Sequence, residues 1–302
     1  MSFCIFDLCC SVGPTLVTHD ATAVAAEVQR IYKNIFPNAG CFFVPQVFGW
    51  AIDCFTGFLD DYLPVDTQYH DFEHTLQGTL CMARILDGRH RAGAKPALTQ
   101  KSFELGLLAI LLHDTGYLKT RDDTTGTGAK YTATHVTRSV EFAAKLLAQK
   151  KFNSKDIRAV QNMIRCTGVD AVLTAIPFQT EQEKIVGFVL GAADLIGQMA
   201  AEDYVKKLPV LYAEFAEAAE NARNGIHFIS MFSSADDLMQ KTPLFWQKYV
   251  LRKLDHEFGG MHHFLNSPYP DGPNFYLTRI EANIEELNKL IASKRTEPAM
   301  RR

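Results

Sequence analysis

The sequence of 302 residues predicts an all-α fold, and two observations support this prediction. First, apolar residues recur at the spacing i, i+4, i+7 and i+11, which places them on one face of a helix. This spacing occurs near both ends of the chain, at Val24, Val28, Ile31 and Ile35 and at Ile280, Ile284, Leu287 and Ile291. Second, no pair of neighbouring segments shows the alternation of apolar and polar residues that is typical of β-strands.

Helical periodicity also predicts eight helices between these two segments. They are expected near residues 46–62, 71–87, 99–112, 133–150, 154–166, 180–201, 203–223 and 242–258. Thr99, Ser154 and Thr180 are candidate N-cap residues, because their hydroxyl groups can accept hydrogen bonds from the first free amides of a helix. Glu183 follows Thr180 by three residues, which predicts a capping box at that helix.

Three segments rich in turn-forming residues interrupt the predicted helices, at 88–96, 121–128 and 267–273. None of them has the character of an interdomain linker. We therefore expect residues 1–40 to form an N-terminal extension. Residues 41–302 are expected to form one helical domain with additional helices at its C-terminal end.

The composition indicates the class of protein, its partners and its cellular location. Hydrophobic residues make up 47% of the chain and charged residues 22%, which is the balance of a globular protein with its own core. The net charge of −3 gives no general reason to expect a nucleic acid duplex or an anionic membrane as a partner. The seven cysteines include no Cys-x-x-Cys pair, and no apolar run is long enough to span a bilayer. These features predict a cytoplasmic protein without a membrane partner, and leave its oligomeric state open.

Histidines or aspartates that could bind metal occur in three places. His70 and His74 lie in the segment YHDFEHT, at positions i and i+4 of a predicted helix, so both imidazoles project from one face. His113 and Asp114 end an apolar helix, where both side chains are costly to bury unless a cation or hydrogen bonds satisfy them. Asp194 lies among small residues in the segment GAADLIG, which permits close helix packing and again calls for a partner. Their joint occurrence predicts metal binding.

This order of motifs resembles the HD superfamily of metal-dependent phosphohydrolases, which includes the class I cyclic-nucleotide phosphodiesterases. The resemblance implies a phosphodiesterase-like helical bundle. YHDFEHT is similar to the phosphodiesterase motif Tyr-His-Asn-x-x-His-Ala, which implies that His74 binds metal and that His70 protonates the leaving group. The resemblance further implies that His113, Asp114 and Asp194 complete the metal ligands, and that Asp114 belongs to the catalytic residues.

The resemblance covers residues 45–200, and within it the chain departs from the phosphodiesterases after Asp114. Their motif continues His-Asp-x-Asp-His-Pro-Gly, whereas this chain reads HDTGYLK. The Asp and His that are missing here help those enzymes to hold a second metal ion. In other HD branches a histidine at the start of the next helix serves that ion, and His135 is the candidate. Where a further ligand histidine is expected, the chain has Cys166, so a second ion is left open.

The implied activity is hydrolysis of a small phosphorylated substrate, either a phosphodiester or a nucleotide. The cofactor is a divalent ion, and the ligand types suit Zn²⁺, Mn²⁺, Mg²⁺ or Fe²⁺ without selecting among them. Such an ion lowers the pKa of bound water towards about 7, which provides hydroxide for attack on phosphorus, while His70 acts as general acid. Lys119 and Lys130 flank the loop after His113 and Asp114, the HD pair, and are candidate phosphate contacts. Gln198, one turn after Asp194, is a candidate substrate contact.

Three other interpretations stay open. The segment HDFEH also fits the inverted zinc-peptidase motif H-x-x-E-H with its glutamate as general base, although this gives the HD pair and Asp194 no role. A di-iron oxygenase of the HD type would use iron to cleave carbon bonds. A helical regulatory module would keep metal or nucleotide bound without turnover.

One more pair of histidines lies outside these motifs. His262 and His263 follow each other near Asn266. We expect this pair to be exposed to solvent rather than to line a pocket, because neighbouring histidines on one turn are commonly found at the surface.

Overall fold

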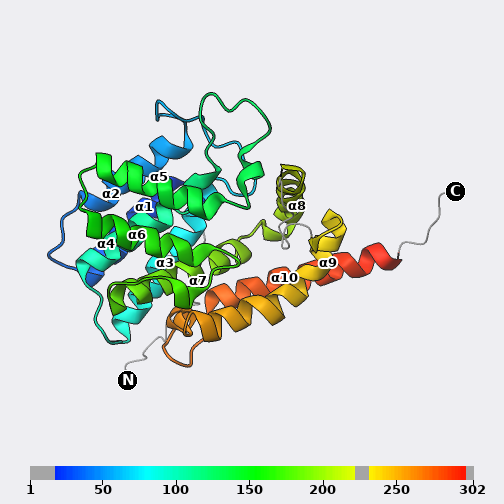
Figure 1. Ribbon diagram of the computed structural model, residues 1–302. Coiled ribbons are helices and arrows are strands. Elements are labelled where there is room, and N and C mark those ends of the chain that lie inside the picture. The colour runs from blue at the N-terminus through cyan, green and yellow to red at the C-terminus, as the bar shows by residue number, and fades with distance from the viewer. Residues whose placement is uncertain (1–17, 222–230, 297–302) are drawn as a thin grey trace, which may run out of the picture.

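The computed structural model describes residues 18–221 and 231–296. Within these ranges the chain forms ten α-helices with short 3-10 and π-helical turns and no β-strand, which confirms the predicted all-α fold. The helices are α1 (Ala21–Ile35), α2 (Phe43–Phe55), α3 (Phe72–Arg91), α4 (Gln100–Leu112), α5 (His135–Gln149), α6 (Ser154–Ile164), α7 (Glu181–Met199), α8 (Tyr204–Asn221), α9 (Ala235–Phe245) and α10 (Phe275–Thr296). Figure 1 shows α1–α7 gathered into one bundle, with α9 and α10 side by side along one edge.

Helices α3 and α7 form the centre of the bundle, and most of their residues are buried. Glycines allow the two helices to approach closely. A Cβ atom at Gly197 would lie 2.8 Å from the carbonyl carbon of Gln77, and one at Gly78 would lie 3.7 Å from the Cα of Asp194. The small residues around Asp194 therefore allow the backbone of α7 to lie against α3 next to Asp194.

The first described helix packs into the same core as the rest of the bundle. Val24, Val28, Ile31 and Tyr32 of α1 are buried in a hydrophobic cluster that also contains residues of α3, α4 and α7. Burying an aliphatic side chain contributes about 1.5–3 kcal/mol. Helix α1, which falls in the range predicted as an N-terminal extension, thus contributes to the core.

The helix expected at 46–62 is shorter than predicted, because α2 ends at Phe55. Gly57 has a φ of +79°, in the left-handed region that favours glycine. A Cβ atom there would lie 2.8 Å from the backbone nitrogen of Pro64. The chain therefore turns sharply after α2 and does not continue as a helix.

The helix expected at 242–258 begins earlier and changes character along its length. Helix α9 begins at Ala235, where Ser234 provides the N-cap. Beyond its last residue the chain continues as two π-helical segments, η6 (Trp246–Val250) and η7 (Lys253–Glu257). Apolar periodicity alone does not distinguish a π turn from an α turn. The sequence could therefore predict that this segment is helical, but not which type of helix it forms.

The predicted N-caps are correct in part. Thr99 caps α4, and its hydroxyl accepts a hydrogen bond from the amide of the third helical residue. Asn153 caps α6, so the assignment of Ser154 is wrong by one residue. Thr180 caps α7 as predicted, but the capping box is not formed, because the Glu183 carboxylate accepts hydrogen bonds from other groups.

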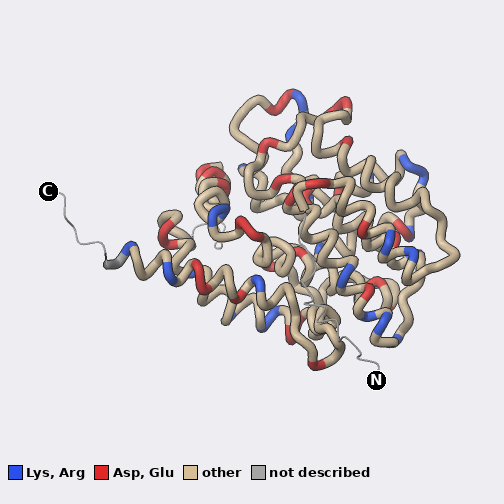
Figure 2. The backbone as a smooth tube through the Cα atoms, turned by 180° about the vertical axis from the view of Figure 1, so that it is seen from behind, with Lys and Arg blue, Asp and Glu red and all other residues tan. Residues whose placement is uncertain are grey.

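Charged residues of both signs are distributed along the fold (Figure 2). Figure 2 shows acidic and basic residues interspersed along most of the described backbone, which agrees with the net charge of −3. No single helix of the described ranges is long and apolar enough to cross a membrane. Helices α7 and α8 have the required length and composition only as a pair, and they are bent by 110° relative to each other.

Candidate metal centre

The first turn of α3 positions His74. Asp71 is the N-cap of this helix, and its carboxylate accepts a hydrogen bond from the His74 amide at 2.8 Å. His70 therefore lies ahead of the helix, which corrects the prediction that both histidines occupy one helical face. Their rings are nevertheless close, with centroids 5.4 Å apart.

His113 is the C-terminal cap of α4, and Asp114 follows it directly. The Nδ1 of His113 donates a hydrogen bond to the carbonyl oxygen of Ile110 at 2.7 Å. Because a carbonyl oxygen can only accept, Nδ1 carries the proton, and a neutral ring presents a lone pair at Nε2. This is the form in which a histidine binds metal.

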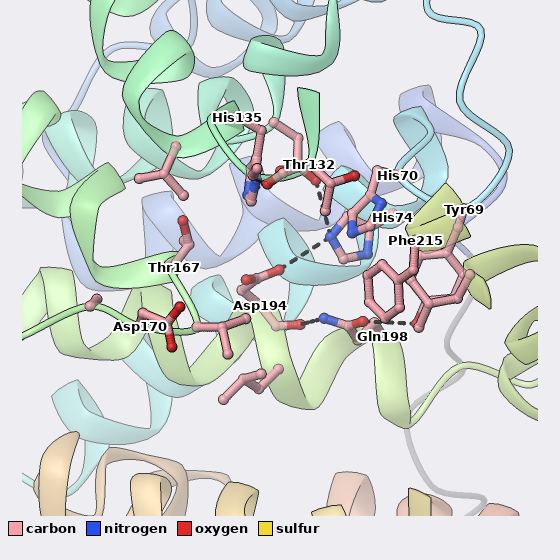
Figure 3. Close-up of a pocket in the computed structure, with 18 of the residues that line it drawn as sticks. Tyr69, His70, His74, Thr132, His135, Thr167, Asp170, Asp194, Gln198 and Phe215 are labelled. Atoms are coloured by element: carbon pink, nitrogen blue, oxygen red, sulfur yellow. Dashed lines mark hydrogen bonds and ion pairs between the residues drawn. The ribbon is translucent and has the colours of Figure 1, made fainter. Parts of the chain in front are cut away.

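Four side chains converge in the core, namely His74, His113, Asp114 and Asp194. The Nε2 of His74 lies 3.2 Å from both Asp114 Oδ2 and Asp194 Oδ1. The Nε2 of His113 lies 3.3 Å from the same two oxygens. Two ligands bound at 2.0–2.1 Å to a tetrahedral ion are separated by about 3.4 Å, so these distances match a metal site. Figure 3 shows His74 and Asp194 directed toward each other at one side of a pocket.

Three of these ligand atoms have no hydrogen-bond partner. His113 Nε2, Asp114 Oδ2 and Asp194 Oδ1 are buried, and no group in the described ranges forms a hydrogen bond with them. A buried polar atom without a partner costs about 1–3 kcal/mol, and a charged one costs more. A divalent cation between the four side chains would satisfy all three atoms, so the donor set fits a metal ion.

The electrostatics of the cluster favour ionised carboxylates. Burial alone would raise the pKa of Asp114 and Asp194, but His113 and His74 beside them hold both pKa values well below the usual range. Burial lowers the pKa of His74, whereas the two carboxylates raise it and dominate, which gives a pKa of about 10. A proton on His74 thus neutralises part of the negative charge of the two carboxylates. A divalent cation would neutralise all of it.

His135 reaches the edge of this cluster from the first residue of α5. Its Nδ1 donates to the carbonyl oxygen of Thr132 at 2.6 Å, and its Nε2 lies 3.9 Å from Asp114 Oδ1. Burial lowers the pKa of His135, so the ring is neutral. It faces the carboxylate oxygen of Asp114 that His74 and His113 do not approach.

Glu214 of α8 holds His70, and sequence reasoning missed it. Its Oε2 accepts from His70 Nδ1 at 2.6 Å, and its Oε1 accepts from the amides of Gln68 and Tyr69 at 2.7 and 2.6 Å. Burial alone would raise the pKa of Glu214, but these hydrogen bonds lower it below its usual value. No local signal marks this residue, since its segment reads as an ordinary helix with regularly spaced glutamates.

Tyr117 is a second residue that the sequence did not reveal. Its ring packs against the imidazoles of both His70 and His135, with centroid separations of 4.6 and 4.8 Å and interplanar angles of 16° and 18°. The tyrosine is 1% exposed. This stack fixes the planes of both imidazoles on the cavity side of the cluster.

A cavity of about 730 Å³ adjoins these residues. One end is polar and contains His70, His74, Asp114, His135 and Asp194. The rest of its wall is mainly apolar and includes Leu195, Met199, Leu208, Leu211, Phe215 and Phe245. Figure 3 shows Phe215 close to Gln198 and Tyr69, opposite Thr167 and Asp170. Among the described residues that line it, Arg165 is the one arginine or lysine, and its guanidinium donates to Asn162 at 2.9 Å.

Gln198 lines the cavity as expected of a substrate contact, but both ends of its amide are occupied. Its Oε1 accepts from the Tyr69 hydroxyl at 2.8 Å, and its Nε2 donates to the backbone carbonyl oxygen of Asp194 at 3.0 Å. The amide therefore links Tyr69 to the helix that carries Asp194.

The two predicted phosphate contacts do not line the cavity. The Lys119 ammonium pairs with Asp66 at 2.9 Å and donates to the Gly126 carbonyl oxygen at 2.6 Å. Lys130 pairs with Asp123 and donates to a backbone carbonyl oxygen of the same loop. Both lysines thus hold the loop together, which corrects their assignment to phosphate binding.

Part of the chain is similar to a known protein family. A family model described as Npun_R2479-like matches residues 121–264, a little less than half of the chain. The match contains His135 and Asp194 and does not reach His74 or the HD pair. A search of curated proteins found no match.

Proposed function

We propose that the protein is a metal-dependent phosphohydrolase of the HD type, acting on a phosphodiester or a nucleotide. One observation carries the proposal. Two imidazole nitrogens lie 3.2–3.3 Å from each of two carboxylate oxygens, and three of these four atoms have no hydrogen-bond partner in the described ranges, at the polar end of a large cavity. The order of these residues along the chain, which resembles the HD superfamily, supports the same assignment.

In this proposal His74, His113, Asp114 and Asp194 hold the ion. A divalent ion, when bound, polarises a phosphoryl oxygen and makes hydroxide available at neutral pH. The two carboxylates neutralise its charge, and the hydrogen bond from His113 to Ile110 keeps that ring in the metal-binding tautomer. The residues of the chain thus supply a fixed position for the reacting phosphate.

His70 is the proton donor of the proposed reaction. Its Nδ1 is engaged by Glu214, so Nε2 is the nitrogen that can present a proton to the cavity, which His70 lines. The hydrogen bond to Glu214 and the contact with the Tyr117 ring fix the orientation of this imidazole. Transfer of this proton to the departing oxygen contributes about 10²–10⁴-fold to the rate.

The cavity favours a substrate that is polar at one end only. Phosphate groups bound away from a metal are usually held by several Arg or Lys side chains. Here the described lining contains one such side chain, whereas its wall is rich in leucine and phenylalanine. An ester whose remaining part is apolar therefore suits the cavity better than a polyphosphate.

The test combines metal analysis with turnover. Protein purified without chelator is expected to contain one or two transition-metal ions per chain, and to hydrolyse a phosphodiester such as bis(p-nitrophenyl) phosphate when loaded with Mn²⁺ or Zn²⁺. Tightly bound metal without hydrolysis of any phosphoester would instead indicate the regulatory module. Absence of metal after reconstitution would remove the basis of the proposal.

The position of His135 favours one second candidate, a di-iron oxygenase. The Nε2 of His135 and the Oδ1 of Asp114 lie 3.9 Å apart, so these two residues would hold a second ion, which would supply the redox chemistry of a di-iron site. Two irons per chain and turnover that requires both iron and air would identify this activity. Hydrolysis supported by Mn²⁺ without oxygen would exclude it.

A further inference from the structure

A second cluster of metal-binding side chains lies outside the cavity, where the rod formed by α9, η6 and η7 ends. After η7 the chain turns through Gly259 and Gly260, whose φ angles are +60° and +68°. It then forms a short 3-10 helix, η8 (Met261–Leu265). This reversal folds η8 back onto η7 and brings two consecutive histidines opposite Asp255.

The distances within this cluster are those of a metal site. Asp255 Oδ1 lies 3.5 Å from His262 Nε2 and 3.5 Å from His263 Nε2. A charge-assisted hydrogen bond would be shorter, at about 2.7–2.9 Å. Two ligands of a tetrahedral ion are separated by about 3.4 Å. The three ligand atoms all lie within 4.8 Å of one another, as the ligands of one ion must.

Burial differs among the three residues in a way that suits ion binding. His262 is 2% exposed, which corrects the expectation that both histidines face solvent. The side chains of His263 and Asp255 are about half exposed, at 53% and 45%. The site thus has one fixed ligand at its base and two at its mouth, with room for water on the solvent side.

The backbone around His262 is held by groups that do not take part in the cluster. The Asn274 amide donates to the His262 carbonyl oxygen at 3.0 Å. A Cβ atom at Gly88 of α3 would lie 1.8 Å from the carbonyl oxygen of Phe264, so η8 is pressed closely against the bundle. The histidine pair is therefore presented by an ordered part of the fold and not by a free loop.

We propose that Asp255, His262 and His263 bind a divalent transition-metal ion at this position, separately from the metal centre of the cavity. Two imidazoles and one carboxylate suit Zn²⁺, Co²⁺, Ni²⁺ or Cu²⁺ better than Mg²⁺ or Ca²⁺, which prefer oxygen ligands. The ion links the end of the rod to η8. Its role is structural, because an ion that binds only the folded chain stabilises the fold.

The experiment compares two single variants of the full chain, His263→Ala and His256→Ala. His263 is a proposed ligand, and His256 is an exposed histidine of η7 outside the cluster, so it serves as the matched control. Both side chains are exposed, so neither substitution opens the core. Chelator-treated proteins are titrated with Zn²⁺ against a chromophoric chelator, and bound ions are counted after gel filtration.

We expect His263→Ala to bind one Zn²⁺ fewer than the wild-type chain, or to bind it on the order of 100-fold more weakly, and His256→Ala to match the wild type. Thermal unfolding should show a smaller upward shift on adding Zn²⁺ for His263→Ala alone. The double variant Asp114→Asn with His263→Ala should lose the ions of both sites. Equal stoichiometry and affinity in His263→Ala and His256→Ala would overturn the proposal, whatever the state of the cavity site.

Discussion

The Nδ1 of His70 lies 2.6 Å from the Oε2 of Glu214, although the two residues are separated by 144 positions in the sequence. The other oxygen of the same carboxylate accepts hydrogen bonds from two backbone amides just before α3. Helix α8 therefore fixes both the orientation of His70 and the course of the chain that carries it. Glu214 is buried, so its charge acts on the imidazole with little screening by solvent.

The variant Glu214→Gln tests this relationship. The amide keeps the size of the side chain and removes its charge, so the hydrogen bond that orients His70 is weakened. We expect kcat to fall by about 10–100-fold while the number of bound metal ions is unchanged. Glu220→Gln, an exposed glutamate of the same helix, is the control and should leave kcat unaltered. An unchanged kcat in Glu214→Gln would show that His70 works without this carboxylate.

Removal of Asp114 tests the metal centre itself. Asp114→Ala removes both carboxylate oxygens of this residue, one of which faces His74 and His113 and the other His135. The ion is then left with three ligands, which together carry less negative charge. We expect the variant to fold and to contain no tightly bound metal by elemental analysis. Asp170→Ala, which removes another carboxylate from the cavity lining, should retain the ion. Full metal occupancy in Asp114→Ala would contradict the assignment of this ligand.

Metal affinity should depend on pH through His74. In the ion-free protein the two carboxylates raise the pKa of His74 to about 10, so the ring is protonated at neutral pH and must lose its proton when an ion binds. Each unit of pH between 6 and 9 is therefore expected to change the apparent affinity by about tenfold, with tighter binding at higher pH. Calorimetric titration with Mn²⁺ in two buffers of different ionisation enthalpy measures the proton release directly. Binding without proton release would mean that His74 is already neutral.

The same shift predicts how the stability of the ion-free protein varies with pH. The folded-state pKa of His74, about 10, lies above its ordinary value of 6.5. The stabilisation from the protonated ring is therefore fully present below pH 6.5 and is lost as pH rises toward 10. Chelator-treated protein should accordingly have a lower Tm at pH 9 than at pH 6.5, and metal-loaded protein should show a smaller change. A Tm that rises over this interval in the chelator-treated protein would contradict the assignment.

The apolar wall of the cavity can be tested by substitution of Leu211. This side chain lines the cavity and is half-buried, so Leu211→Gln replaces apolar contact area by a polar group without opening the core. We expect KM for an ester with a large apolar group to rise by about tenfold, which corresponds to about 1.4 kcal/mol, with little change in kcat. Leu244→Gln is the control, because Leu244 is 57% exposed on α9 and does not line the cavity. A KM unaffected by Leu211→Gln would indicate that the substrate does not contact this wall.

The sequence could predict the fold class because each helix carries its own apolar periodicity. It could also indicate His74, the HD pair and Asp194, because a histidine or carboxylate inside an apolar or small-residue segment is visible without knowledge of the fold. The close contact between α3 and α7 follows from small residues that can be read in the same way.

The remaining parts of the site depend on contacts between distant segments. Glu214 and Tyr117 act on His70 through tertiary packing, and nothing in their own neighbourhoods distinguishes them. Their place after His113 and Asp114 in the sequence makes Lys119 and Lys130 candidates for phosphate binding. Their charges are instead taken by carboxylates of the surrounding loops, and sequence proximity does not report the direction of a side chain.

The approach of α7 to α3 leads to a last prediction, on Gly197. A Cβ atom at this position would lie 2.8 Å from the carbonyl group of Gln77, which is backbone and cannot move aside. In Gly197→Ala the two helices must separate, and Asp194, three residues earlier, moves away from His74. We expect a loss of about 1–3 kcal/mol in the free energy of unfolding together with weaker metal binding.

Gly49→Ala provides the matched comparison for this substitution. Gly49 lies inside α2, and a Cβ atom there would meet nothing within 4 Å. Alanine should therefore stabilise the protein by about 0.5–1 kcal/mol through the lower entropy of its unfolded chain. Urea unfolding with metal titration on both variants measures the two effects. Metal affinity in Gly197→Ala equal to that in Gly49→Ala would show that the spacing between α3 and α7 does not set the geometry of the metal centre.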